Sequence, residues 1–453
     1  MKSLLVKINN KLNAQGGFLK AVSVLVGGTA FAQIIGFLCL PILTRLYSPE
    51  DYSVLGVYVA IVSILSVISC LRFEIAIPIP EQDKEAKALL ILSLLTNCTF
   101  VIFLYITLFI SYPYIKNFHV IQQLSLWVWC IPLGVFLSGL YSALQFWATR
   151  RKRFKDIAQT RMTQAIFSNG TSLSIGASTG GFWGLILGQL FSFGGGLLKL
   201  SSSTFHDLKD VKETSKLNST LYKYKSYPKY STFEALTNTS AIQLPLIIIA
   251  SLIIGPEVGY LMLAMKIMTL PMSLLGATIA QVYYAQAAEK KQKGILKEYT
   301  IDIIVQLQKI SCLIPLGAFI LYLLIPFVLG EKWYRTGEIL LWMTPWFVLQ
   351  FIASPISMVM HLQGKQKQML LLTVSGLLLR IGAIFLAVTF FGSYLAEAFA
   401  LSSAVFYLIC YFVFCNSINV DLITQFYILK KNKVFMLVLL ASLSLIFLFM
   451  DIV

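Results

Sequence analysis

Long apolar stretches recur along the chain from Phe18 to Met450, and short polar or charged segments separate them. Each stretch is close to the roughly 20 residues that a helix needs to cross about 30 Å of hydrocarbon. The stretches are too long for barrel strands, and they lack the alternation of apolar and polar residues that such strands carry. Because lipid offers no partner to backbone N–H and C=O groups, helices remain as the spanning element. The pattern therefore predicts an all-α, polytopic bundle of membrane helices.

Hydropathy and turn residues together predict thirteen spans. The first one begins at Phe18 and has no small-residue cleavage site behind it, so we interpret it as a retained helix and not as a signal peptide. The last follows three lysines close together and is predicted to cross the membrane, with a shallow peripheral helix as the alternative. The spans are placed at 18–43, 52–78, 87–110, 122–148, 158–178, 180–200, 230–254, 257–285, 302–329, 338–362, 368–391, 393–416 and 434–450.

The lysine-rich segment 201–229 divides the first twelve spans into two sets of six. We therefore expect an N-terminal lobe at 1–200, a cytoplasmic linker loop at 201–229, a C-terminal lobe at 230–416 and a C-terminal extension at 417–453.

A weak internal repeat supports two matching lobes. Pro49-Glu50 opens the second span and Pro256-Glu257 opens the eighth, while Trp129-x-x-Pro132 and Trp342-x-x-Pro345 lie in the fourth and tenth. Both pairs are related by the same shift of six helices. Duplicated lobes of this kind are a common plan among membrane transporters.

Charge and composition add one prediction, the orientation of the chain in the membrane. Only 12% of the residues are charged and 57% are hydrophobic, whereas about a quarter of a soluble protein is charged. The formal net charge of +16 would suggest a nucleic-acid partner in a soluble protein. Here most of the cations fall in short loops on one side of the predicted spans. The positive-inside rule then predicts a multi-pass protein of the bacterial inner membrane with a cytoplasmic N-terminus and no nucleic-acid partner.

The seven cysteines lie in or at the ends of apolar segments and lack the paired spacing of metal ligands. We therefore expect neither disulfides nor a metal or other cofactor.

Small residues at strict four-residue spacing mark one face of the sixth span and one of the first. Such stripes let the backbones of neighbouring helices approach closely, so both predict helix-packing faces. The residues are Gly180, Gly184, Gly188, Ser192 and Gly196, and Gly28, Ala32 and Gly36.

Apart from Lys20, Lys87 and Lys199, which stand at span ends and are counted with the inside segments, five cations lie within predicted spans: Arg72, Arg161, Lys266, Lys309 and Arg380. A cation at the centre of a membrane helix costs about 2.5–3.5 kcal/mol, so it normally faces a wet cavity or a partner.

Arg380 is the strongest site candidate among these cations, because it lies about 18 Å from either end of its span. At helical spacing it shares a face with four small or polar residues, as a cavity wall would: Thr373, Gly376, Ala383 and Ala387.

Lys266 is the second candidate, on a stripe with Gly259, Thr269, Ser273 and Tyr284. Lys309 follows Asp302 and Gln306 near the inner end of its span, where snorkelling to the headgroups and lining a cavity are equally good interpretations. Arg161 is interpreted as an extension of the neighbouring basic loop.

Glu74 and Glu397 are the acids placed deepest in the predicted spans. Either could titrate during transport, or balance a neighbouring cation, which we favour. Arg72 and Glu74 are two residues apart, and on a helix such residues point in different directions, so each is expected to need another partner.

Three stretches near the N-terminus closely resemble the start of Wzx-type polysaccharide-unit flippases, within the multidrug/oligosaccharidyl-lipid/polysaccharide exporter superfamily. They are Gly28-Thr-Ala-Phe-Ala-Gln33, Pro41-Ile-Leu-Thr-Arg-Leu-Tyr-Ser-Pro-Glu-Asp-Tyr52 and Leu71-Arg-Phe-Glu-Ile-Ala-Ile77. The resemblance covers about the first 80 positions. It implies two six-helix lobes around a central cavity, and the segment 434–450 is an extra C-terminal helix beyond that plan.

The resemblance also implies a function and partners. The substrate would be an undecaprenyl-diphosphate-linked oligosaccharide repeat unit, moved by alternating access from the cytoplasmic to the periplasmic leaflet for O-antigen, capsule or a related polysaccharide. The lipid bilayer and the polymerase and chain-length machinery would be its partners. In such relatives cavity cations bind the headgroup, and we assign this role by inference to Arg380, Lys266, Arg72 and Lys309.

Two other functions fit the sequence less well. A cation-coupled exporter of the same superfamily would share the fold, but such exporters favour acidic cavities, whereas cations are in excess here. A membrane polymerase or ligase would need a sizeable outer loop, and the predicted outer loops have only about a dozen residues or fewer. We therefore expect a transporter and not an enzyme.

Overall fold

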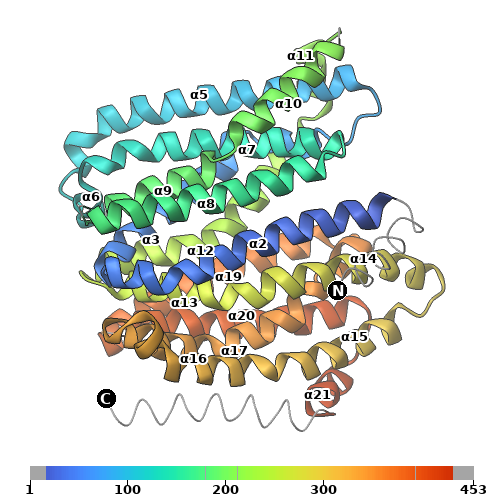
Figure 1. Cartoon of the computed structure of the whole chain (residues 1–453). Helices are drawn as coiled ribbons and strands as arrows, with labels where there is room; N and C mark the ends of the chain where they lie inside the picture. Colours follow the sequence, from blue (N-terminus) through green and yellow to red (C-terminus); the bar gives the residue numbers. More distant parts are fainter. Residues whose placement is uncertain (1–16, 179, 212, 393, 432–453) are drawn as a thin grey trace, which may run out of the picture. The chain divides into compact units, whose positions relative to one another are not determined.

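The computed structural model describes residues 17–178, 180–211, 213–392 and 394–431. These residues form helices joined by short turns, with no strand among them (Figure 1). In this part of the chain, ten helices are long and apolar enough to cross a membrane, which confirms the predicted fold class. They are Gly27–Leu46, Pro49–Ser69, Asp83–Ile115, His119–Arg150, Trp183–Asp210, Tyr227–Leu252, Leu296–Leu329, Glu331–Ile356, Gln366–Phe391 and Leu395–Ser417.

The helices belong to two compact units. The first unit comprises Met1–Tyr47 and Val57–Thr239, and the second comprises Ser48–Gly56 and Ser240–Val453. The chain passes between the units at three points: just before α3 (Pro49–Ser69), inside α3, and inside α12 (Thr232–Leu252).

The first unit is built on α2 (Gly17–Leu46), α5 (Asp83–Ile115), α7 (Cys130–Arg150), α8 (Phe154–Ser178) and α9 (Trp183–Gly194), together with the rest of α3. Helix α8 packs along α2 on one side and α9 on the other, and α5 packs along α7. Tyr47, at the end of α2, is fully buried and donates a hydrogen bond from its hydroxyl to the carbonyl of Ser172 in α8 at 2.6 Å. This contact fixes the end of α2 against α8.

The segment 201–229, expected as a loop, is largely helical. It holds most of α10 (Leu197–Asp210), all of α11 (Leu217–Lys223) and a π-helical turn at Tyr227–Ser231. Leu197, Leu200, Thr204 and Asp207 are buried at helical spacing. An amphipathic helix therefore forms where a composition rich in Lys and Ser suggested a loop.

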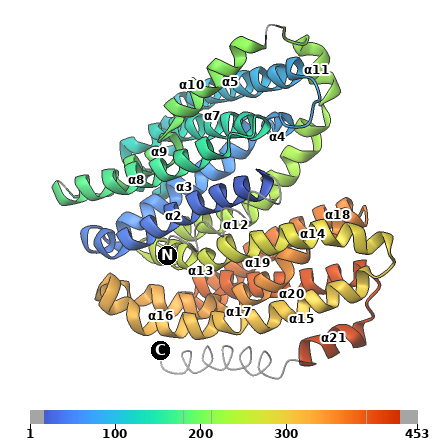
Figure 2. The same cartoon turned by 45° about the vertical axis from the view of Figure 1, so that its right-hand side comes forward.

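The second unit is centred on α17 (Tyr334–Ile356), most of which is buried. Around it lie α13 (Glu257–Pro271), α14 (Ala277–Gln292), α15 (Leu296–Ser311), α16 (Leu313–Leu329) and α20 (Leu395–Ser417), and α19 (Gln366–Phe391) packs along α20 (Figure 2). The first turns of α3 complete this unit, because Tyr52 meets the buried ring of Trp333 edge-on at a centroid distance of 5.1 Å.

Several predicted spans differ from the helices observed, and one lies outside the described residues. The second is interrupted after Ser69, and the sixth is divided between α9 and α10. The fifth forms α8, which has 25 residues but is too polar to count among the ten apolar helices. The eighth forms α13 and α14 with a π-helical turn, Met272–Gly276, between them. The predicted thirteenth span, 434–450, falls outside the described residues.

The predicted glycine stripe of the sixth span is a packing face at Gly184 and Gly188, and Gly196 also lies close to Thr160 of α8. A Cβ atom at Gly184 would collide with the Tyr47 hydroxyl, and one at Gly188 would collide with Ser172 of α8. Gly180 and Gly196 instead have positive φ angles of 68° and 81° and lie in the turns on either side of α9. The outer glycines thus serve turns, which glycine adopts at no steric cost.

The stripe on α2 is also divided. A Cβ atom at Gly28 would lie 2.6 Å from the Cβ of Ala158 in α8, whereas nothing lies within 4 Å of one at Gly36. We expect Gly28→Leu to destabilise the protein by about 1–3 kcal/mol, the usual cost of overpacking. Gly36→Leu is the matched control on the same helix and should unfold like the wild type. Thermal unfolding in detergent measures both, and equal melting temperatures for the two variants would contradict the α2–α8 contact.

Candidate functional site

Arg380 is only 2% exposed, although it lies in the middle of α19. Its Nε donates a hydrogen bond to the Ser403 hydroxyl of α20 at 2.9 Å, and its guanidinium lies over the Phe406 ring, 4.4 Å from the centroid. Gly376 makes room for this arrangement, because a Cβ atom there would collide with the Phe406 ring. Arg380 is thus held between α19 and α20 by a hydroxyl and an aromatic face.

On the predicted face of α19, Thr373, Gly376 and Ala387 are buried with Arg380, whereas Ala383 is half-buried. Ala383 and Ala387 line an apolar cavity that Arg380 does not line. Among the described residues, no carboxylate forms an ion pair with Arg380. Its positive charge is therefore not neutralised by any carboxylate of that part of the chain, and it can attract an anion over several ångströms where the dielectric is low.

Lys266 is exposed on α13, and Thr269 and Ser273 are exposed on the same face. The expected stripe does not continue to Gly259, which is buried. A Cβ atom at Gly259 would meet the carbonyl of Pro49, so this position is a close helix contact and not part of a wet surface. The side chain of Tyr284, the last residue of the predicted stripe, lies outside the described set.

Lys309 is exposed on α15 together with Asp302 and Gln306, while the opposite face of this helix is buried. This exposure is compatible with both interpretations of Lys309, snorkelling to the headgroups and lining a wet cavity. Arg161 is half-buried and its Nη1 donates to the Thr29 hydroxyl of α2 at 2.5 Å, so it joins α8 to α2.

Arg72 and Glu74 correct one expectation. Helix α3 ends at Ser69, and Leu71 and Arg72 adopt φ angles of 49° and 62°, so the helix is broken before α4 (Phe73–Ala76) begins. The break brings Nη1 of Arg72 to 3.8 Å from Oε1 of the buried Glu74. The two residues therefore do pair, because the helical geometry that would separate them is absent.

Sequence reasoning missed Arg335, which falls between the ninth and tenth predicted spans. Arg335 binds Glu338 and Glu257 at 3.0 Å each, and it also forms an ion pair with Glu397. Glu257 and Glu397 stand in the first turns of α13 and α20, where the positive end of the helix dipole stabilises a carboxylate. This geometry supports charge balance as the role of Glu397, which is 2% exposed.

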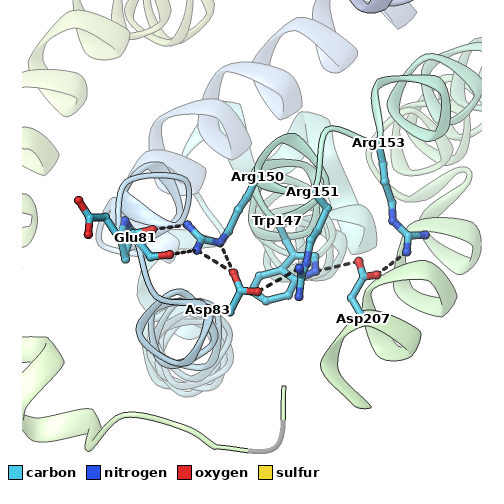
Figure 3. A network of polar contacts seen from close by, with 8 residues as sticks. Glu81, Asp83, Trp147, Arg150, Arg151, Arg153 and Asp207 are labelled. Atoms are coloured by element: carbon cyan, nitrogen blue, oxygen red, sulfur yellow. Dashed lines mark hydrogen bonds and ion pairs between the residues drawn. The ribbon is translucent and has the colours of Figure 1, made fainter. Parts of the chain in front are cut away.

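A second charged cluster lies at the end of α7 and fastens α5 to it (Figure 3). Arg150 donates to Oδ1 of Asp83 at 2.7 and 3.0 Å and to the carbonyls of Pro80 and Glu81. Arg151 pairs with the other Asp83 oxygen at 3.0 Å and lies over the Trp147 ring.

The same cluster attaches α10. The indole N–H of Trp147 donates to Oδ2 of Asp207 at 3.3 Å, and Arg153 pairs with Oδ1 of that residue (Figure 3). Cations of the basic segment after the fourth predicted span are therefore partly neutralised by carboxylates of α5 and α10. No set of three His, Cys, Asp or Glu side chains in the described ranges is arranged to hold a metal ion.

The fold is similar to that of solved membrane transporters. A multidrug resistance MATE family transporter of the MOP superfamily, in an inward-facing conformation, matches 85% of this chain and 94% of its own with a TM-score of 0.65 at 15% identity. The lipid II flippase MurJ matches 94% and 99% with a TM-score of 0.63 at 14% identity. A MOP superfamily transporter from Pyrococcus furiosus matches 89% and 97% with a TM-score of 0.59 at 13% identity. At these identities the likeness shows the fold alone.

Sequence comparisons give the family. A search of curated proteins finds no match. The model of the family described as "Polysaccharide biosynthesis protein" matches residues 42–338, which is more than half of the chain. The matched range runs from the end of α2 through the first turn of α17, and so includes helices of both units. The chain therefore belongs to this polysaccharide biosynthesis protein family and has the fold of MOP superfamily transporters, as the resemblance of its first 80 residues predicted.

Proposed function

We propose that the protein is a flippase that moves undecaprenyl-diphosphate-linked oligosaccharide repeat units from the cytoplasmic to the periplasmic leaflet of the inner membrane. The product would serve O-antigen, capsule or a related surface polysaccharide. Membership in a polysaccharide biosynthesis family supports the pathway, and the transporter fold supports movement across a membrane as opposed to bond formation. The proposal includes alternating access of two lobes around a central cavity, with the N-terminus in the cytoplasm.

The observation that carries the proposal is the buried Arg380, whose charge no described carboxylate neutralises. A diphosphate linked to sugars cannot enter hydrocarbon unaided, because an unpaired charge in that medium is strongly disfavoured. An uncompensated guanidinium at mid-helix depth lowers this penalty for an anionic headgroup. Lys266, exposed on α13, would add a second cation. Lys309 and Arg72 are weaker candidates, since Lys309 has a snorkelling alternative and Arg72 is paired with Glu74.

A cation-coupled exporter is the second candidate function. The observation in its favour is the cluster of Glu257, Glu338 and Glu397 around the single Arg335. Two of these acids are stabilised by the helix N-termini on which they stand, so the cluster is explained without a transported or coupling cation.

Deleting the gene tests the proposed function. We expect loss of the surface polysaccharide together with retention of lipid-linked repeat units on the cytoplasmic side. Normal polymer in the deletion strain would refute the assignment. Normal delivery of repeat units with failed polymerisation would point to an enzyme of the same pathway.

Arg380→Met tests the mechanism, because methionine keeps an unbranched stem but removes the charge. We expect export to fall at least about tenfold at equal protein abundance, since a hydrogen bond with a charged group contributes about 1.5–3 kcal/mol. Arg380→Lys keeps the charge and should retain part of the activity. Complementation of the deletion strain, with membrane abundance measured in parallel, gives the readout. If Arg380→Met exports as well as wild type, Arg380 is not part of the site.

A further inference from the structure

A groove of about 580 Å³ lies between the start of α19 and the end of α20, within the second unit. Its size is in the range of pockets that hold small ligands. The two helices run antiparallel there, because Nζ of Lys365, just before α19, donates to the carbonyl of Ser417, the last residue of α20, at 3.3 Å. The groove therefore has a polar end at the helix termini and continues along the helices toward their middle.

The polar end offers hydrogen-bond donors and positive charge. Lys365 is half-buried, and no ion pair joins it to an acid in the part of the chain that the structure describes. The side-chain amides of Gln368 and Asn416 are exposed beside it. Helix α19 also begins without a side-chain cap, so the N–H groups of its first turn add the positive end of a 26-residue helix. Cation, amides and free N–H groups are the donors that bind phosphate in proteins.

The rest of the groove is mainly apolar, and the hydroxyl of Ser375, which also lines it, already donates to the carbonyl of Leu372. Leu371 and Val413 line it about one turn further along each helix, and Leu371 is 68% exposed. A free inorganic anion would make no favourable contact with such an apolar wall. A molecule with a phosphate at one end and a hydrocarbon chain next to it would contact both parts of the groove at once.

We propose that this groove binds the phosphate head of an anionic amphiphile, with Lys365 on the phosphate and the first part of the chain against Leu371 and Val413. Two sources carry this chemistry: an anionic phospholipid of the bilayer, and a polyprenyl diphosphate such as the proposed substrate. The inference does not depend on the proposed function, because a phospholipid alone can contact both the polar and the apolar part of the groove.

Binding to the purified full chain, held in phosphatidylcholine nanodiscs, tests the site. The probes are dioctanoyl phosphatidylglycerol, farnesyl diphosphate and inorganic diphosphate. The variants are Lys365→Ala and Lys367→Ala; the second removes an exposed cation two residues away that does not line the groove. We expect Lys365→Ala to weaken binding of an amphiphile at least about tenfold and Lys367→Ala to change it less than about twofold.

The outcomes separate the two sources. Tighter binding of farnesyl diphosphate than of phosphatidylglycerol assigns the groove to the lipid-linked diphosphate, and the reverse order assigns it to a bilayer phospholipid. Equal effects of Lys365→Ala and Lys367→Ala would overturn the proposal. So would inorganic diphosphate binding as tightly as farnesyl diphosphate, because the apolar wall would then contribute nothing.

A second variant, Leu371→Trp, fills the groove without changing its charge. Because Leu371 is exposed, the variant should melt like the wild type while losing at least about tenfold in affinity for the amphiphile. Unchanged affinity in a folded Leu371→Trp protein would also overturn the proposal. None of these measurements requires export, so the deletion strain can fail to support a flippase while the groove still binds its ligand.

Discussion

Replacing Arg335 with alanine is expected to remove most of the folded protein from the membrane. Arg335 is the cation shared by Glu257, Glu338 and Glu397, and Glu397 is almost completely buried. Removing one partner of a buried ion pair costs about 3–5 kcal/mol, because the other charge is left uncompensated. A loss of that size is a large fraction of the 5–15 kcal/mol by which proteins are typically stable. Membrane abundance and thermal unfolding in detergent measure the effect.

Two further variants separate loss of charge from loss of packing. Arg335→Lys keeps the cation but cannot contact all three acids through a planar fork, so an intermediate stability is expected. Arg335→Ala combined with Glu397→Gln removes the uncompensated buried charge and should recover part of the loss. A melting temperature for Arg335→Ala equal to that of wild type, or no recovery in the double variant, would contradict this account.

Gly259→Val is the second substitution with a large expected effect. A Cβ atom at Gly259 would meet the carbonyl of Pro49 and the backbone N of Ser53, so two helix backbones touch at this point. A flexible side chain could rotate away, but backbone atoms cannot, and α13 would have to move from the start of α3. We expect destabilisation at or above the upper end of the 1–3 kcal/mol range for overpacking.

Gly382→Val is the matched control for Gly259→Val, because it adds the same side chain to a helix at a position with nothing within 4 Å. It should melt close to the wild type, apart from the small change in helix propensity. Thermal unfolding of both variants in the same detergent compares them directly. If Gly259→Val is as stable as Gly382→Val, the close contact between α3 and α13 is wrong.

The hydrophobic pattern was sufficient to predict the fold class and part of the candidate site. Runs of about 20 apolar residues leave few options in a bilayer, so the helices followed from physics. The face of Arg380 was predicted from helical spacing, because Gly376 and Thr373 stand one and two turns before it. The residues that contact this face of α19 could not be predicted from the spacing. Phe406 and Ser403 lie on the next helix, and spacing within one helix does not identify partners on another.

The remaining differences come from tertiary contacts and from local backbone geometry. The break at Leu71 and Arg72 has no glycine or proline to mark it, so helical spacing was wrongly extended to Glu74. Arg335 falls between two predicted spans, and its distant partners come from α13 and α20, so spacing along the sequence could not identify them. The helix α10 carried a readable signal at Leu197, Leu200, Thr204 and Asp207, but its lysines and serines obscured it.

The division of α3 between the two units has a consequence for gene dissection. Ser48–Gly56 packs with the second unit, where Tyr52 touches Trp333 and Pro49 touches Gly259, while the rest of the helix belongs to the first. A fragment that starts after the first half of the sequence would therefore lack a piece of its own interior. A single cut in the polypeptide therefore does not yield two fragments that each contain a whole unit. If two halves are expressed separately, the fragment that carries α3 must supply the first residues of that helix to the second unit.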